Sequence, residues 1–137
     1  MRIPVIKGTI KRRLLVNFRA DPAVVQRILP QPFRPKLHRG FSLVGICLIR
    51  LERVRPAGLP GALGLSSENA AHRIAVEWID AGGIQREGVF IPRRDTGSLL
   101  NRVAGGRVFP GEHHRARFSV VDTDGHIDFV MESMMAQ

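Results

Sequence analysis

The sequence predicts a β-rich α+β fold, in which a curved or barrel-like antiparallel sheet carries a few short helices. Three observations support this prediction: apolar, β-branched runs of strand length recur along the chain, turn sequences such as Asp-Gly separate several of them, and apolar residues at helical spacing occur only in short stretches. Strands joined by tight turns are typical of antiparallel sheets that close on themselves. The interior of such a sheet is a natural site for a small molecule.

Length and composition set the domain organisation. The chain has 137 residues, of which 44% are hydrophobic, so we expect one folded domain over residues 1–137. The longest apolar run, residues 41–49, is too short to cross a bilayer. Residues 1–20 lack the apolar core and cleavage site of a secretory signal, so the expected location is the cytoplasm, with no membrane partner.

The first elements follow from local signals. Residues 14–18 (Leu-Leu-Val-Asn-Phe) predict a strand, and residues 23–29 have apolar positions at helical spacing. Asp21 can cap that helix, and Pro22 suits its first turn. We therefore expect a strand followed directly by a short helix.

A long apolar run follows. Residues 41–51 predict a central strand, in which Gly45 marks a bulge or the close approach of another backbone. Cys47, the single cysteine, is expected to be a small buried hydrophobe. Residues 55–66 contain two prolines and three glycines and predict a long loop.

The second half alternates strands with turns. Residues 72–79 and 85–91 predict two strands joined through a hairpin-type turn at residues 80–83. Residues 115–121 and 127–131 predict a last hairpin. Between these hairpins, a short helix is expected with its apolar face at Leu99, Leu100 and Val103 and its cap at Asp95, Thr96 or Ser98.

Charge is concentrated in one half of the chain. The net charge is +9, and 13 of the 21 Lys and Arg residues fall within residues 1–55, which hold only two acidic residues. A basic surplus of this size attracts nucleic acid or other anions, and the attraction weakens as salt rises. The aromatic residues show no stacking pattern of the single-strand binders, so nucleic-acid binding is the second hypothesis.

Arg93 and Arg94 directly precede the expected helix start at residues 95–98. Free backbone N–H groups and the helix dipole favour an anion there, and two cations beside them would suit a carboxylate or phosphate. The alternative is structural: Asp95 caps the helix and pairs with one arginine, while the other is solvated.

Glu68 and Arg73 lie where the loop is expected to give way to a strand, a position at which polar groups often face a pocket. They could face each other or a ligand. Alternatively, Asn69 bonds the backbone and Arg73 covers apolar surface with its stem.

Residues 112–114 (Glu-His-His) resemble a metal site only superficially. Neighbouring residues on a strand point to opposite faces, so the two imidazoles would not bind one ion together. We predict no metal. His114 alone could act as an acid or base near neutral pH.

Residues 86–94 (Arg-Glu-Gly-Val-Phe-Ile-Pro-Arg-Arg) resemble the signature of acetoacetate decarboxylase. In that enzyme the strand ends in two lysines, the first of which forms a Schiff base with the substrate. Here Arg93 and Arg94 occupy the lysine positions, and a guanidinium that keeps its proton cannot attack a carbonyl as an amine does. The resemblance implies the scaffold without the Schiff-base decarboxylase activity, and it leaves open whether the protein is an enzyme.

Three runs together, residues 66–74, 91–98 and 105–114, resemble the uncharacterised YqjF-like family, which is similar in fold to acetoacetate decarboxylase and belongs to its superfamily. The resemblance implies a β-barrel fold and no cofactor. Members of that family are usually longer and continue into further strands. An open sheet edge left by missing strands would pair with another copy, so a homo-oligomer, most simply a dimer, is expected.

These observations lead to one leading hypothesis, a protein that binds a small organic anion in the sheet interior without Schiff-base chemistry. Arg93 and Arg94 would hold the acidic group. Glu68, Arg73 and His114 are secondary candidates. The alternatives are a basic nucleic-acid-binding protein and a structural remnant that has no ligand.

Overall fold

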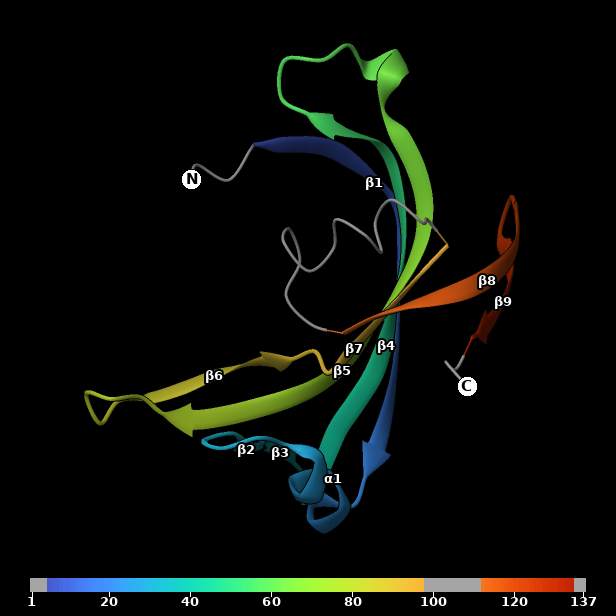
Figure 1. The fold of residues 1–137 in the computed structure, drawn as a ribbon. Helices are drawn as coiled ribbons and strands as arrows, with labels where there is room; N and C mark the ends of the chain where they lie inside the picture. Colours follow the sequence, from blue (N-terminus) through green and yellow to red (C-terminus); the bar gives the residue numbers. More distant parts are fainter. Residues whose placement is uncertain (1–4, 98–111, 135–137) are drawn as a thin grey trace.

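A strongly curled mixed sheet dominates the computed structural model, which describes residues 5–97 and 112–134. The sheet forms a half-barrel, and one short α-helix packs near one end of it in the part described (Figure 1). This confirms the β-rich prediction. The elements are β1 (Ile6–Ala20), α1 (Pro22–Ile28), β2 (Arg34–Pro35), β3 (Leu37–His38), β4 (Phe41–Pro56), a 3-10 turn (Gly61–Leu63), β5 (Leu65–Ile79), β6 (Gln85–Phe90), β7 (Arg93–Thr96), β8 (Glu112–Thr123) and β9 (His126–Ser133).

Three long strands form the body of the sheet. β4 pairs antiparallel with β1 on one side and with β5 on the other. β5 then pairs with two strands in succession, first β7 and, further along, β6. β7 pairs with β8 in parallel, so the expectation of a purely antiparallel sheet was wrong at this one pair.

The short helix forms where the sequence predicts it. The Asp21 side chain accepts a hydrogen bond from the Ala23 backbone N–H at 2.8 Å, which satisfies one of the free N–H groups of the first turn. Val25 is buried within α1 and Leu29 directly after it, and both belong to one apolar cluster with Ile74 and Val76 of β5. This cluster is the main apolar core of the described residues at the α1 end of the sheet.

Gly45 confirms the predicted close approach of another backbone. A Cβ atom at this position would lie 2.5 Å from the carbonyl oxygen of Val16 on β1, far inside van der Waals contact. Cys47, two residues further along β4, is buried, as expected.

Two boundaries differ from the sequence prediction. β5 begins at Leu65, so Glu68 and its neighbours lie within a strand and not at a junction between loop and strand. Asp95 and Thr96 belong to β7, and the Asp95 carboxylate binds Arg93, His72 and Ser133. The helix expected around Leu99 and Val103 falls outside the described residues.

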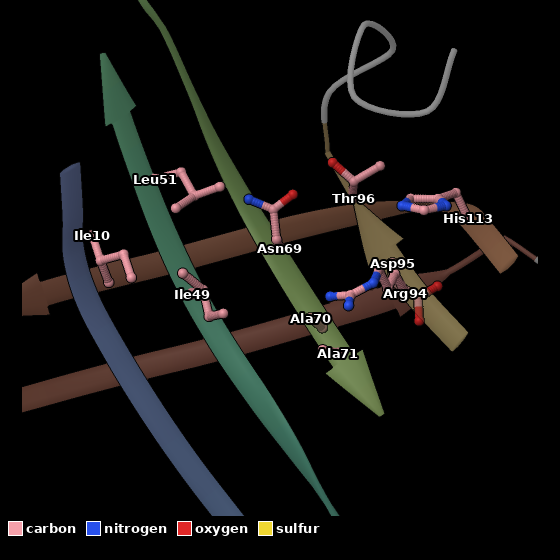
Figure 2. A pocket seen from close by; sticks show the side chains of 10 residues that line it. All are labelled: Ile10, Ile49, Leu51, Asn69, Ala70, Ala71, Arg94, Asp95, Thr96 and His113. Atoms are coloured by element: carbon pink, nitrogen blue, oxygen red, sulfur yellow. The ribbon is translucent and has the colours of Figure 1, made fainter. Parts of the chain in front are cut away.

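The last hairpin is confirmed. β8 and β9 are joined by a turn in which Gly125 has a φ of 80°, and residues 116–123 of β8 pair with all of β9. Beyond its pairing with β7, this ribbon extends away from the long strands (Figure 1), and in the view of Figure 2 it passes behind them. No helix in the described part of the chain is long and apolar enough to cross a membrane.

Candidate pocket on the sheet

A pocket of about 190 Å³ lies on one face of the sheet where β1, β4, β5, β7 and β8 come together (Figure 2). Its wall is apolar on the side of β1 and β4 and polar on the side of β7 and β8. The lining residues are Ile10, Ile49, Leu51, Asn69, Ala70, Ala71, Arg94, Asp95, Thr96 and His113.

Strand pairing places the lining residues in rows. One row runs from Ile49 through Asn69 to Thr96, which are paired positions on three successive strands. The next row consists of Ala71, Arg94 and His113. Because paired residues on neighbouring strands project from the same face, both rows present their side chains to one pocket.

Arg94 is the arginine of this wall. Burial lowers the pKa of Arg94, and a smaller electrostatic effect of Cys47 on β4 opposes this shift. An arginine does not lose its proton in a protein, so the cost of burial falls on a guanidinium that stays charged. A negative group in the pocket would offset that cost.

Asp95 anchors β7 from behind the pocket. Its carboxylate is fully buried and accepts hydrogen bonds from the Arg93 guanidinium at 2.9 and 3.1 Å and from the Ser133 hydroxyl at 2.6 Å. Nε2 of His72 lies 2.8 Å from the same carboxylate. Burial opposes ionisation, but these hydrogen bonds and the charge of Arg93 outweigh it and hold the pKa of Asp95 below its usual range.

This cluster ties β7 to its neighbours. Arg93 also donates to the Ser133 hydroxyl, so one buried carboxylate and one guanidinium join β5, β7 and β9. Side chains alternate along a strand, so fixing Arg93 and Asp95 on one face directs Arg94 to the other. The cluster therefore positions the pocket arginine.

A second ionic cluster lies further along the same rear face. Arg12 donates from Nη2 to both carboxylate oxygens of Glu68, at 2.7 and 2.8 Å, and both side chains are 11% exposed. Nη1 of Arg12 reaches Asp122 of the hairpin at 3.1 Å, and the guanidinium lies 5.8 Å from the ring centroid of Phe129. Arg12 thus joins β1 and β5 to the β8–β9 ribbon.

Comparison with known proteins identifies a family for this chain. Residues 8–136 match DUF2071, described as an uncharacterized conserved protein. The chain belongs to the DUF2071 family. No curated protein and no solved structure matches its sequence.

The structure of this DUF2071 protein separates the residues that the sequence grouped as a site. Arg94 faces the pocket, whereas Arg93 binds Asp95 and Glu68 binds Arg12 on the rear of the sheet. Arg73 lies beyond Ala71 on the pocket face, by strand alternation, and it does not line the pocket. His114 lies 3.4 Å from the Glu112 carboxylate and is also absent from the lining.

Sequence reasoning missed three polar residues of the DUF2071 pocket, Asn69, Thr96 and His113. Alternation along a strand predicted that His113 and His114 point to opposite faces, but no local pattern indicates which of the two faces holds the pocket. Asn69 was considered only as a loop anchor. Its side-chain amide does bond locally, to the hydroxyl oxygen of Ser67 at 2.9 Å and to the Ser67 carbonyl oxygen at 3.2 Å, although both residues lie in β5.

Proposed function

We propose that this DUF2071 protein binds a small organic anion in the pocket, with Arg94 holding the acidic group. The observation that carries the proposal is the position of Arg94, a charged residue on the polar side of a pocket whose other side is aliphatic. Arg93 and Glu68 bind Asp95 and Arg12 behind the sheet and do not line the pocket, so Arg94 is the proposed contact for the ligand because it is the arginine among the described lining residues.

Chemistry favours a carboxylate as the acidic group. A planar guanidinium offers two parallel N–H donors, which match the two oxygens of a carboxylate. Hydrogen bonds that involve a charged group contribute about 1.5–3 kcal/mol each, and more where water is excluded. The hydroxyl of Thr96, the amide of Asn69 and the imidazole of His113 supply further polar groups around the same space.

Replacing Arg94 by glutamine is expected to weaken binding of butanoate at least tenfold, because the variant keeps polar atoms but loses the charge. Isothermal titration with butanoate and its neutral analogue butanamide measures the effect. The unaltered protein should prefer butanoate, and R94Q should lose that preference. The matched control is R27Q, which removes the same charge from the exposed last turn of α1 and should bind like the unaltered protein.

Equal affinity for butanoate and butanamide in the unaltered protein would contradict the anion proposal. So would an equal loss of affinity in R94Q and R27Q, since that result would assign the effect to net charge and not to the pocket.

We also propose that the fold belongs to the acetoacetate decarboxylase-like superfamily and that the chain is related to the YqjF-like proteins. The curled β-rich sheet is consistent with this placement. Arg93 and Arg94 stand where that enzyme has lysines, and Lys7, Lys11 and Lys36 do not line the described pocket.

Incubation with acetoacetate and borohydride is therefore expected to leave no covalent adduct on this protein. Mass spectrometry of the intact chain measures this, with a Schiff-base decarboxylase as the positive control. A reduced adduct on any lysine, accompanied by turnover of acetoacetate, would show that Schiff-base chemistry is retained.

Nucleic-acid binding receives less support from the arrangement of the basic residues. Arg12 is paired with Glu68 and Asp122, and Arg50 lies 3.6 Å from both Glu52 and Glu68. Part of the positive charge of the amino-terminal half is therefore compensated within the fold, and nucleic-acid binding stays the alternative. The expected dimer and the cytoplasmic location also stay predictions.

A further inference from the structure

The pocket changes character from one end to the other. In Figure 2, Ile10, Ile49 and Leu51 occupy the end formed by β1 and β4, while Arg94 and His113 occupy the end formed by β7 and β8. Neighbouring strands lie about 4.8 Å apart, so β7 is roughly 10 Å from β4 and roughly 14 Å from β1 along the sheet. A ligand that lies across the strands would extend from a charged end to an aliphatic end.

A small side chain keeps part of the middle of the pocket open. Ala71 lies on β5 between the two ends, on the same face as Asn69, and it is buried. Ala71 is paired with Arg94, so it lies directly beside the charged group. A larger side chain at Ala71 would fill the passage from Arg94 toward Ile49.

The volume limits the size of the ligand. A cavity of about 150 Å³ is enough to bind benzene, which has six non-hydrogen atoms. By the same proportion, a cavity of about 190 Å³ suits roughly seven or eight non-hydrogen atoms. A carboxylate group uses three of these atoms, which leaves about four or five for an aliphatic chain.

The charge of the lining sets the charge of the ligand. Arg94 is the only Arg or Lys among the described lining residues, and the wall toward β4 is aliphatic. A dicarboxylate would place a second charge against Ile49 or Leu51, where burial of an uncompensated charge is costly. The lining therefore fits an acid that carries one negative group and an apolar remainder.

We propose that the ligand is an unbranched aliphatic monocarboxylate of about five or six carbons, with its acid group on Arg94 and its chain lying across β5 against Ile49 and Leu51. This inference rests on the proposed anion-binding function. It adds the chemical class of the ligand, and it predicts that affinity depends on chain length.

A series of carboxylates tests the proposal on the unaltered protein. Acetate, butanoate, hexanoate and octanoate are titrated by calorimetry at constant pH and ionic strength. Affinity is expected to rise about fourfold for each methylene added up to hexanoate, since each buried methylene contributes about 0.8 kcal/mol. The rise should fall below about twofold per methylene between hexanoate and octanoate, because the extra carbons no longer fit.

Two variants test where the aliphatic chain of the ligand lies. I49A should weaken hexanoate binding about fivefold and leave acetate unchanged, while A71V should block hexanoate more strongly than acetate. The control is I84A, at a residue that is 55% exposed near the turn between β5 and β6. If a variant fails to fold, the chain-length series on the unaltered protein decides alone.

The outcomes separate the two proposals. Equal affinity for acetate and hexanoate, with binding still lost in R94Q, would overturn the aliphatic ligand and leave the anion site standing. Absence of binding by every carboxylate, or equal binding by R94Q, would overturn the anion site and the ligand class together.

Discussion

Replacing Arg12 by alanine is expected to lower the free energy of unfolding by about 3 kcal/mol or more, because removal of one partner leaves the other charge buried. Glu68, whose side chain is 11% exposed in the unaltered protein, would lose both of its short hydrogen bonds to Arg12. Arg50, 3.6 Å from Glu68, can compensate only in part. The same change removes the contact of Arg12 with Asp122 and so loosens the hairpin.

Urea denaturation measures this loss, and R86A provides the control. Arg86 pairs with Asp80 at 2.8 Å, but its side chain is 53% exposed, so R86A should cost about 1 kcal/mol or less. Equal losses in R12A and R86A would show that the Arg12 pair contributes no more than a surface ion pair.

A double variant, with methionine at Arg12 and leucine at Glu68, tests whether the loss in R12A comes from leaving the Glu68 charge without its partner. Buried ion pairs are often no more stabilising than apolar residues of similar volume, and Nε of Arg12 is buried without a hydrogen-bond partner among the described residues. The double variant should therefore recover much of the stability that R12A loses.

Replacing Asp95 by asparagine is expected to destabilise the protein by about 2–4 kcal/mol, because charge-assisted hydrogen bonds weaken and Arg93 loses its buried counter-charge. The same variant should also weaken butanoate binding, since β7 would no longer hold Arg94 firmly. Asparagine has nearly the same size and shape as aspartate, so the local packing should be retained.

The effect of Asp95 on stability should depend on pH in a defined direction. Its pKa is lowered in the folded protein, so its contribution is complete well above the unfolded value of about 3.9 and is lost as pH falls through the folded value. The difference in unfolding free energy between the unaltered protein and D95N should therefore shrink from about pH 5 downward.

D128N is the matched control for this experiment. Asp128 lies on β9 and is largely exposed, so its replacement should change stability little between pH 7 and pH 3. A difference between the unaltered protein and D95N that stays constant over the same range would contradict the assigned role of the Asp95 carboxylate.

Local signals predicted those parts of the fold that depend on local chemistry. The helix start follows from the Asp21 cap and Pro22, and the strand at Gly45 follows from its apolar run. The start of β5 could not be predicted in this way. Ser66 and Glu68 are polar residues typical of loops, and Glu68 is accommodated in a strand by Arg12, 56 residues earlier in the chain.

In the candidate site, too, local sequence predicted some features, while contacts between distant residues determine others. The pair Arg93 and Arg94 was identified from the sequence, but the distinction between them depends on the face of β7 that each occupies. That choice is made by Asp95, whose carboxylate is bound by Ser133 on β9, and by the parallel pairing of β7 with β8. Contacts between residues so distant in the chain leave no local pattern in the sequence.

The central claim is tested most directly by a crystal structure of the protein with 5-bromopentanoate. Anomalous scattering from the bromine locates the end of the ligand's aliphatic chain. We expect the carboxylate on the Arg94 guanidinium and the bromine beside Ile49, Leu51 or Ile10. A ligand bound elsewhere on the protein, or bound in the pocket with its carboxylate turned away from Arg94, would contradict the account.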